Sequence, residues 1–135
     1  MPIAMWCVLL AGILPIATTG LAKWGAKDFD NSKPREWETS LEGWRKRAKA
    51  AASNAFEVFP FFAAAVLVAW TQGAPQEWVD RLAIVFVVAR LAYVWAYVAD
   101  RPTVRSGVWA LGFFVTIAIF LASLWGGGDA PPPPA

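Results

Sequence analysis

The sequence predicts an all-α membrane protein, a bundle of four transmembrane helices. Three observations support this fold class. The 135 residues are 58% hydrophobic and only 16% charged, whereas a soluble domain usually carries about 25% charge. Four apolar stretches each reach the roughly 20 residues that a helix needs to cross the bilayer core. The connections between these stretches hold most of the charged residues.

The first predicted span covers residues 3–22 and carries no charge until Lys23. Its apolar stretch is longer than that of a cleaved signal peptide, and no basic segment precedes it, so we expect a mature helix. The second predicted span covers residues 48–70. Asn54 and Glu57 are the polar residues that lie deepest within it.

The third predicted span covers residues 78–99 and has Arg90 near its middle, and the fourth covers residues 107–125 without a charge. Residues 1–125 are therefore expected to form a single transmembrane domain. The remaining segment, residues 126–135, has the low-complexity sequence GGGDAPPPPA. A segment of this composition has nothing to pack in a core, so we expect a disordered tail.

The long connection between the first two spans contains two local signals. The sequence DNSKPR at residues 30–35 predicts a turn, because Asp, Asn, Ser and Pro favour turn conformations. The sequence TSLE at residues 39–42 matches the capping box that begins many helices. We therefore expect the second helix to begin near Ser40 and to protrude from the membrane by one or two turns.

Basic residues are concentrated on one side of the predicted membrane. Eight of the 12 Lys and Arg residues lie in the first connection and its flanks, and Arg101 and Arg105 lie in the third connection. The opposite side has only Arg81 near the end of a span. The positive-inside rule predicts that the first and third connections are cytoplasmic and that both termini lie outside.

Several classes of function are excluded by composition. The chain has no histidine and a single cysteine, Cys7, which excludes His-dependent catalytic triads, multi-cysteine metal sites and an intrachain disulfide. We expect no metal. The net charge of +2 is too small to indicate a nucleic-acid partner. The expected partner is the lipid bilayer.

Glu57 and Arg90 are ionisable groups inside predicted spans, where such groups are costly and usually functional. Counted from the cytoplasmic ends of their helices, the two lie at similar depths. We therefore expect an ion pair between the second and third spans. The alternative to a functional role is that this pair serves only as a structural clamp between the two helices.

Further polar residues accumulate in the same half of the last three spans. Asn54 and Glu57 share one helix face, and Arg90, Tyr93 and Tyr97 share another, because residues three or four apart lie on one side of a helix. Together these residues predict one polar cavity that opens to the cytoplasm. Arginines outnumber the single glutamate there, so an anion with several hydrogen-bonding groups would fit. The predicted set is Arg47, Asn54, Glu57, Arg90, Tyr93, Tyr97 and Arg105.

Two stretches of the chain resemble the MAPEG family, the membrane-associated proteins in eicosanoid and glutathione metabolism. Residues 47–60, RAKAAASNAFEVFP, are similar to the family's second helix, with its Arg followed by Asn-x-x-Glu. Residues 90–97, RLAYVWAY, followed after a short turn by Arg105 and Ser106, are similar to its third helix and the start of its fourth. Residues 30–35 resemble the bacterial branch.

The resemblance implies a homotrimer of four-helix bundles in a bacterial cytoplasmic membrane, with glutathione bound between subunits as co-substrate of a lipophilic small molecule. It implies that Arg105 stabilises the thiolate, that Glu57 binds the ammonium of glutathione, and that Arg90 binds a carboxylate or holds Glu57 in place. The residues that it assigns to binding glutathione are Arg47, Asn54, Glu57, Arg90, Tyr93 and Tyr97.

The chemistry of an arginine beside a thiol agrees with this function. A thiol with a pKa of about 8.5 is mostly protonated at neutral pH. A guanidinium beside the sulfur favours the thiolate, which is the nucleophile, and arginine always carries its charge. Such a thiolate would serve a glutathione transferase, a peroxidase or an isomerase, and the sequence does not choose between these activities.

Two alternative functions remain, one from a departure from the family pattern and one from a likeness to another class of four-span membrane proteins. Ala50 and Ala52 stand where the eukaryotic enzymes carry polar residues, which favours a non-catalytic family member that binds a lipid or small anion as scaffold or sensor. A small multidrug transporter also has four spans and a membrane glutamate. It would require a net negative cavity and an acid in the first span, and this sequence has neither.

Overall fold

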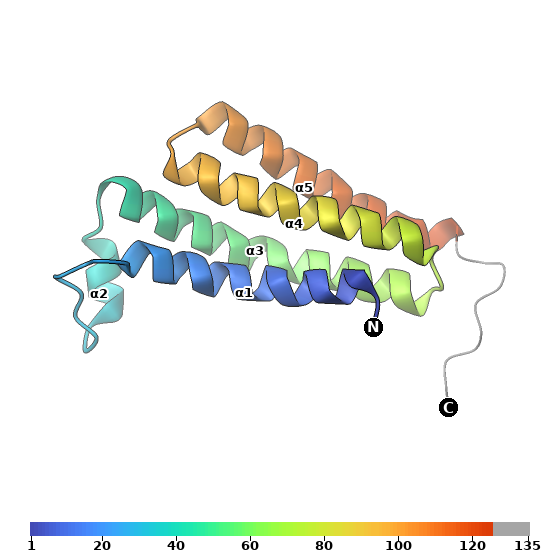
Figure 1. Ribbon diagram of the computed structural model, residues 1–135, viewed down its shortest axis with the longest axis horizontal. Helices are drawn as coiled ribbons and strands as arrows, with labels where there is room; N and C mark the ends of the chain where they lie inside the picture. The colour runs from blue at the N-terminus through green and yellow to red at the C-terminus, as the bar shows by residue number, and fades with distance from the viewer. Residues whose placement is uncertain (126–135) are drawn as a thin grey trace.

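The structure, a computed structural model, describes residues 1–125, and all of its secondary-structure elements in that range are helical. Four long helices alternate in direction along the bundle (Figure 1). They are α1 (Ile3–Lys23), α3 (Gly43–Thr71), α4 (Gln76–Val98) and α5 (Pro102–Ala122). The short helix α2 (Pro34–Thr39) lies between α1 and α3, and a 3-10 turn (Ser123–Trp125) follows α5. The disordered tail expected at residues 126–135 lies outside the described residues.

Each long helix is long and apolar enough to cross a membrane, α5 together with the 3-10 turn that follows it. The expected all-α fold with four spanning helices is therefore confirmed. Many large apolar side chains point away from the bundle, as helices that face lipid require. Among them are Leu9, Ile16, Leu67, Val88 and Phe114, each about half exposed or more.

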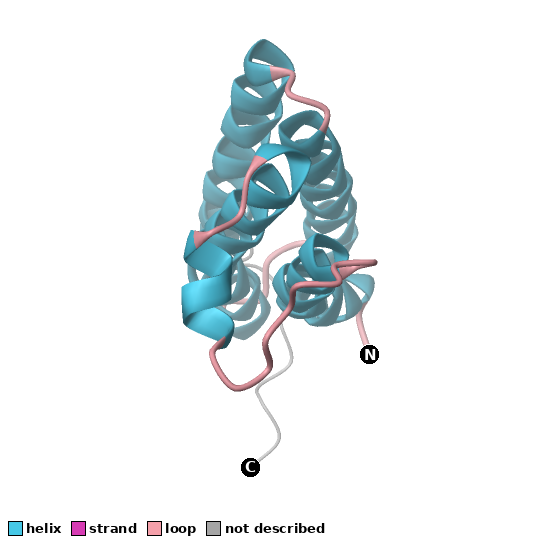
Figure 2. Cartoon of the chain, turned by 90° about the vertical axis from the view of Figure 1, so that its left-hand side faces the viewer, coloured by secondary structure: helices cyan, strands magenta, loops and turns pink. Residues whose placement is uncertain are grey.

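The two ends of the bundle carry different connections (Figure 1). Helix α2, the connection from α1 to α3 and the turn from α4 to α5 lie at one end, which we call the α2 end. The N-terminus and the turn from α3 to α4 lie at the other end. Figure 2, which looks at the bundle from the α2 end, shows α2 lying against the outside of the helices. The long charged connection thus covers part of the α2 end.

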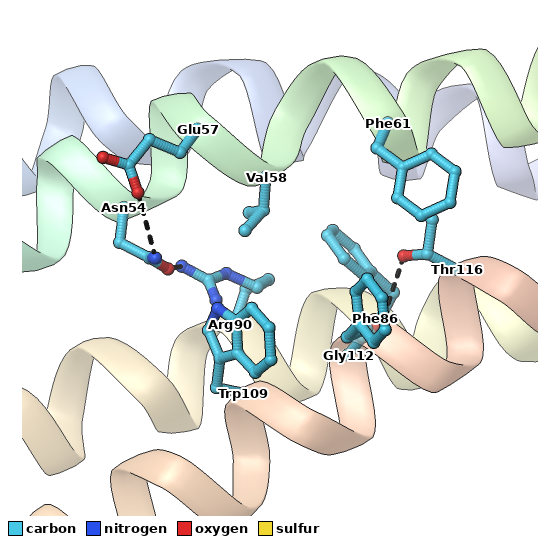
Figure 3. Close-up of a pocket in the computed structure, with 10 residues that line it drawn as sticks. Asn54, Glu57, Val58, Phe61, Phe86, Arg90, Trp109, Gly112 and Thr116 are labelled. Carbon is cyan, nitrogen blue, oxygen red and sulfur yellow. Dashed lines mark hydrogen bonds between the residues drawn. The ribbon is translucent and has the colours of Figure 1, made fainter.

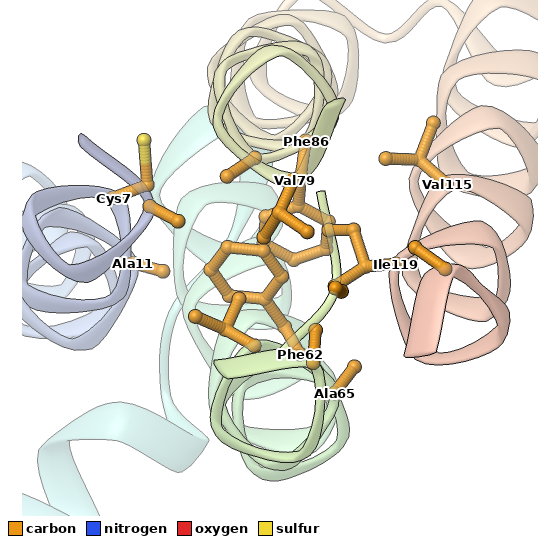
Figure 4. Close-up of a cluster of buried hydrophobic side chains, with 14 residues drawn as sticks. Cys7, Ala11, Phe62, Ala65, Val79, Phe86, Val115 and Ile119 are labelled. Atoms are coloured by element: carbon orange, nitrogen blue, oxygen red, sulfur yellow. The ribbon is translucent and has the colours of Figure 1, made fainter. Parts of the chain in front are cut away.

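The core lies between the four helices in the half of the bundle away from α2 (Figure 4). Phe62 of α3 and Phe86 of α4 stack face to face at its centre, with ring centroids 3.8 Å apart and planes at 7°. Both rings are almost fully buried, and Ile119 of α5 packs in the same cluster. The α1 side contributes small residues, including Ala4 and Ala11. Small residues let helix backbones approach closely, which is how membrane helices gain packing energy.

Charged side chains bind the ends of neighbouring helices. At the α2 end, Arg45 Nη1 donates to the carbonyl oxygen of Ala22 at 2.8 Å, and Arg47 Nε donates to that of Val98 at 3.1 Å. Both carbonyls belong to the last turn of a helix, where a positive charge is favourable. At the opposite end, Asp80 Oδ1 accepts from the backbone N–H of Ala4 at 2.8 Å, where a negative charge is favourable.

The predicted start of the second helix near Ser40 is wrong. Residues Thr39 and Ser40 do not begin a helix; their hydroxyls donate to the carbonyl oxygens of Glu36 and Trp37, each at 2.7 Å, and so close the end of α2. Helix α3 begins at Gly43 instead. Residues 39–42 match the capping-box pattern, but in the structure the two hydroxyls form hydrogen bonds at the C-terminus of α2 rather than at the N-terminus of α3.

The turn predicted at residues 30–35 is confirmed only in its first part. Asp30 Oδ1 accepts from the backbone N–H of Ser32 at 2.9 Å and from its hydroxyl at 2.6 Å, and these bonds lower the pKa of Asp30. Pro34 then begins α2, where its fixed φ suits the first helical turn. The ring of Trp37 is buried against that of Phe29, edge to face with centroids 5.0 Å apart, which fastens α2 to the turn.

Candidate functional site

A chain of hydrogen bonds joins α3 and α4 in the half of the bundle nearer α2 (Figure 3). Arg90 Nη2 donates to Asn54 Oδ1 at 2.7 Å, and Asn54 Nδ2 donates to Glu57 Oε2 at 3.4 Å. The amide of Asn54 can do both because it carries an acceptor and a donor. Asn54 therefore connects the guanidinium of α4 to the carboxylate of α3.

The direct ion pair predicted between Glu57 and Arg90 is wrong. Within residues 1–125 the only salt bridges join other residues. The two side chains do lie in the same cluster, but Asn54 occupies the position between them. The carboxylate of Glu57 is exposed on the outside of the bundle, whereas Arg90 is only 3% exposed.

Arg90 is the most deeply buried charged residue that the structure describes. Its guanidinium lies 4.2 Å from the ring centroid of Tyr93, and its Nε has no hydrogen-bond acceptor among the described residues. A buried donor without an acceptor is costly, and an ordered water, an ion or a catalytic role are the explanations that such a group calls for.

The second arginine of the cluster, Arg105, comes from the first turns of α5. Its guanidinium lies 4.5 Å from the ring centroid of Tyr97. The rings of Tyr97 and Tyr93 meet edge to face with centroids 5.7 Å apart. Cations and rings thus alternate in the order Arg90, Tyr93, Tyr97, Arg105, and each cation faces the electron-rich surface of a ring.

Two neighbouring cavities open onto these residues. One, of about 210 Å³, is lined mostly by polar side chains: Asn54, Tyr93, Arg105, Ser106 and Trp109. The other, of about 240 Å³, has Asn54, Glu57 and Arg90 at one end and continues between α3, α4 and α5 into an apolar part lined by Val58, Phe61, Phe86, Trp109, Gly112, Phe113 and Thr116. Asn54 and Trp109 line both cavities and so form the boundary between them.

The structure brings together most of the residues that the sequence singled out, but not all. Asn54, Glu57, Arg90, Tyr93 and Arg105 line one or both cavities. Tyr97 adjoins them through its contacts with Tyr93 and Arg105. Arg47 lines neither cavity, because its guanidinium is bonded to the end of α4.

The main residue that sequence reasoning missed is Trp109. Its ring stacks on that of Phe113, with centroids 5.3 Å apart and planes at 8°. Trp109 follows Arg105 by four residues and therefore lies on the same face of α5. This spacing is the signal that could have found it, but the surrounding residues are aromatic and apolar, as on any face that meets lipid.

Among residues 1–125, no group of three or more Cys, Asp or Glu side chains is placed to hold a metal ion. The chemistry of the site comes from three features. Two arginines lie over the faces of tyrosine rings, one carboxylate is exposed, and an apolar cavity adjoins a polar one. In sequence comparisons, the family model described as the MAPEG family matches residues 3–125, which include all four long helices. No curated protein matches the chain.

Proposed function

The chain belongs to the MAPEG family, and we propose that it binds glutathione and uses the thiolate of the tripeptide to conjugate or reduce lipophilic electrophiles. The observation that carries the proposal is the position of Arg105. Its guanidinium lines a polar cavity that shares a wall with an apolar one. A cation in this position can hold a thiolate next to the place where an apolar molecule would sit.

The charges of the cluster match those of glutathione, which carries two carboxylates and one ammonium at neutral pH. Arg90 would take a carboxylate, because its side chain lines the cavity beside Asn54 and Glu57. Glu57 would take the ammonium, since its carboxylate is exposed and, among residues 1–125, is bonded only to the amide of Asn54. Tyr93 and Tyr97 would contact the peptide with the polar edges of their rings. Arg47 would take part only through the guanidinium nitrogens that do not bond Val98.

The electrophile would enter the apolar cavity from the bilayer, between α3 and α5. There the sulfur lone pair forms a bond to the electrophilic carbon, and the leaving group departs with the bonding electrons. Arg105 lowers the barrier because it favours the thiolate over the protonated thiol at neutral pH. The reaction therefore joins a water-soluble thiol to a substrate that partitions into lipid.

The exposure of Glu57 supports the proposal that the protein acts as a homotrimer. A carboxylate that faces lipid at the depth of a spanning helix is costly. Glutathione held between neighbouring copies would cover it. We further propose that the α2 end faces the cytoplasm of a bacterium, where the positive-inside rule places it, and that both termini face the other side of the membrane.

Titration of glutathione into the purified protein tests the proposal. We expect an increase in ultraviolet thiolate absorbance and a rise in melting temperature, because a ligand that binds only the folded state stabilises it, by about 2.7 kcal/mol at a hundredfold excess over Kd. S-methylglutathione, the matched control, should raise the melting temperature without thiolate absorbance. If millimolar glutathione gives neither signal, the proposal fails and a non-catalytic membrane protein that binds a lipid or another anion takes its place.

Replacing Trp109 with alanine should lower kcat/KM for a halogenated nitrobenzene by about twofold to 13-fold, the range that a lost aromatic stack of about 0.5–1.5 kcal/mol gives. The melting-temperature shift caused by glutathione should fall by a smaller factor than kcat/KM, because Trp109 is one of five residues that line the polar cavity. The matched control is Trp95→Ala, because Trp95 is a lipid-facing tryptophan of α4 that lines neither cavity. Equal losses in the two variants would mean that Trp109 does not contact the electrophile.

A further inference from the structure

A larger cavity lies on another side of the bundle, between α1, α2 and α3. Its volume is about 480 Å³, and it shares no lining residue with the two cavities of the candidate site. Its α3 residues, Lys49 and Phe56, are two helical turns apart on one face of the helix. Asn54 and Glu57 belong to a different face. The cavity is therefore separate from the proposed glutathione site.

The outer part of this cavity is positively charged. Lys23 of α1, Arg35 of α2 and Lys49 of α3 line it, and Glu38 of α2 is the only acidic residue among them. One oxygen of Glu38 lies 3.5 Å from Arg35 Nη1 and the other lies 3.5 Å from Lys49 Nζ. The carboxylate of Glu38 thus pairs with two of the three cations. With three positive charges and one negative charge in its lining, the cavity has an excess of two positive charges.

The inner part of the cavity is apolar and lies on the exposed surface of the spanning helices. Ile16 lies seven residues before Lys23 on α1, and Phe56 lies seven residues after Lys49 on α3. Seven residues of helix span about 10 Å, so both apolar side chains lie about 10 Å further from the α2 end than the two lysines. Ile16 is 66% exposed and Phe56 is 51% exposed. The cavity is therefore cationic at its outer end and hydrocarbon-like further in.

We propose that this cavity binds one anionic phospholipid of the surrounding bilayer, with its phosphate among Lys23, Arg35 and Lys49 and the upper part of an acyl chain on Ile16 and Phe56. The order of polarity along the cavity is the same as that along a lipid molecule. Cations near the end of a spanning helix attract anionic headgroups. The apolar floor distinguishes a lipid from a free phosphate, which would leave Ile16 and Phe56 uncovered.

The proposal gives a role to helix α2, which the sequence did not predict. Pro34, Arg35 and Glu38 of α2 form one wall of the cavity. Without α2, the two lysines would line an open groove between α1 and α3. A bound lipid would therefore fasten α2 to the two spanning helices.

The test measures the stabilisation of the full-length protein by two lipids with identical acyl chains, dioleoylphosphatidylglycerol and dioleoylphosphatidylcholine, in detergent micelles. We expect the anionic lipid to raise the melting temperature more, to bind as one retained molecule per chain in native mass spectrometry, and to lose this advantage at high salt. Glycerol phosphate at the same concentration should give no shift. Equal shifts with both lipids, or an equal shift with glycerol phosphate, would overturn the proposal.

Variants locate the binding. The double variant Lys23→Gln/Lys49→Gln should weaken binding of the anionic lipid at least tenfold, because each cation near the membrane surface contributes about a fivefold factor. The matched control is Lys27→Gln/Lys46→Gln, which removes the same charge from two exposed lysines outside the cavity. If the double variant does not fold, Lys49→Arg takes its place in the test. This variant keeps the charge and should bind the anionic lipid as the unsubstituted protein does. Equal losses in the matched pair, or a full loss in Lys49→Arg with the fold intact, would contradict the proposal.

Discussion

Replacing Arg105 with alanine is expected to lower kcat/KM for glutathione conjugation at neutral pH by about 100-fold to 1000-fold, the usual effect of removing one group that stabilises a developing or reacting anion. The guanidinium of Arg105 lines the polar cavity and faces the ring of Tyr97, so its loss leaves no cation among the described residues that line this cavity. The thiol of bound glutathione should then regain a pKa near 8.5.

The pH dependence separates this role from a structural one. The thiolate fraction falls as pH drops below the thiol pKa, so a variant with a raised thiol pKa should lose most activity near pH 7 and recover part of it in alkaline buffer. Arg101→Ala is the matched control, because Arg101 lies one turn earlier, is exposed and lines neither cavity. A loss in Arg105→Ala that stayed constant from neutral to alkaline pH would show that Arg105 does not act on the thiol.

Replacing Asn54 with leucine is expected to destabilise the folded protein by about 3–5 kcal/mol, because it leaves a buried charge without its partner. Arg90 is 3% exposed, and the amide oxygen of Asn54 is its only hydrogen-bond acceptor among the described residues. Thermal or denaturant unfolding in detergent measures the loss. Ser53→Ala is the matched control, because Ser53 is the exposed neighbour and its hydroxyl donates to the carbonyl oxygen of Lys49 within its own helix.

The relative stabilities of two variants show whether Arg90 and Glu57 are connected directly or through Asn54. With Asn54 between them, Asn54→Leu should cost far more stability than Glu57→Gln, because the carboxylate of Glu57 is exposed and accepts its hydrogen bond from Asn54 rather than from Arg90. A direct ion pair would give the reverse order. The double variant Asn54→Leu/Arg90→Leu should be more stable than Asn54→Leu alone, since the buried charge is then removed together with its partner.

The sequence was sufficient to predict the four spanning helices, because long apolar stretches have few alternatives in a chain with so little charge. It could not predict α2. A six-residue helix is not stable by itself, and α2 depends on the contact between Trp37 and Phe29. The hydroxyls of Thr39 and Ser40 were assigned to the wrong helix because side-chain hydrogen bonds at a helix start and a helix end use the same residue types.

The candidate site was predicted in its location and mostly in its residues, but not in its connections. Spacing on a helix shows which residues share a face, so Asn54 with Glu57 and Tyr93 with Arg90 could be grouped. It does not show which of two partners on one helix meets a residue on another. The choice between Asn54 and Glu57 as the partner of Arg90 depends on the rotation of α3 against α4, which only the packed bundle fixes.

The two bonds from the start of α3, from Arg45 to the end of α1 and from Arg47 to the end of α4, also determine how the protein meets membranes of different thickness. A slide of α3 by one turn would move it about 5.4 Å and break both bonds. When hydrophobic mismatch arises, the bundle should therefore tilt as one body and keep its helices in register. Asn54, two turns beyond Arg47, would then keep its distance to Arg90 in thin and thick bilayers alike.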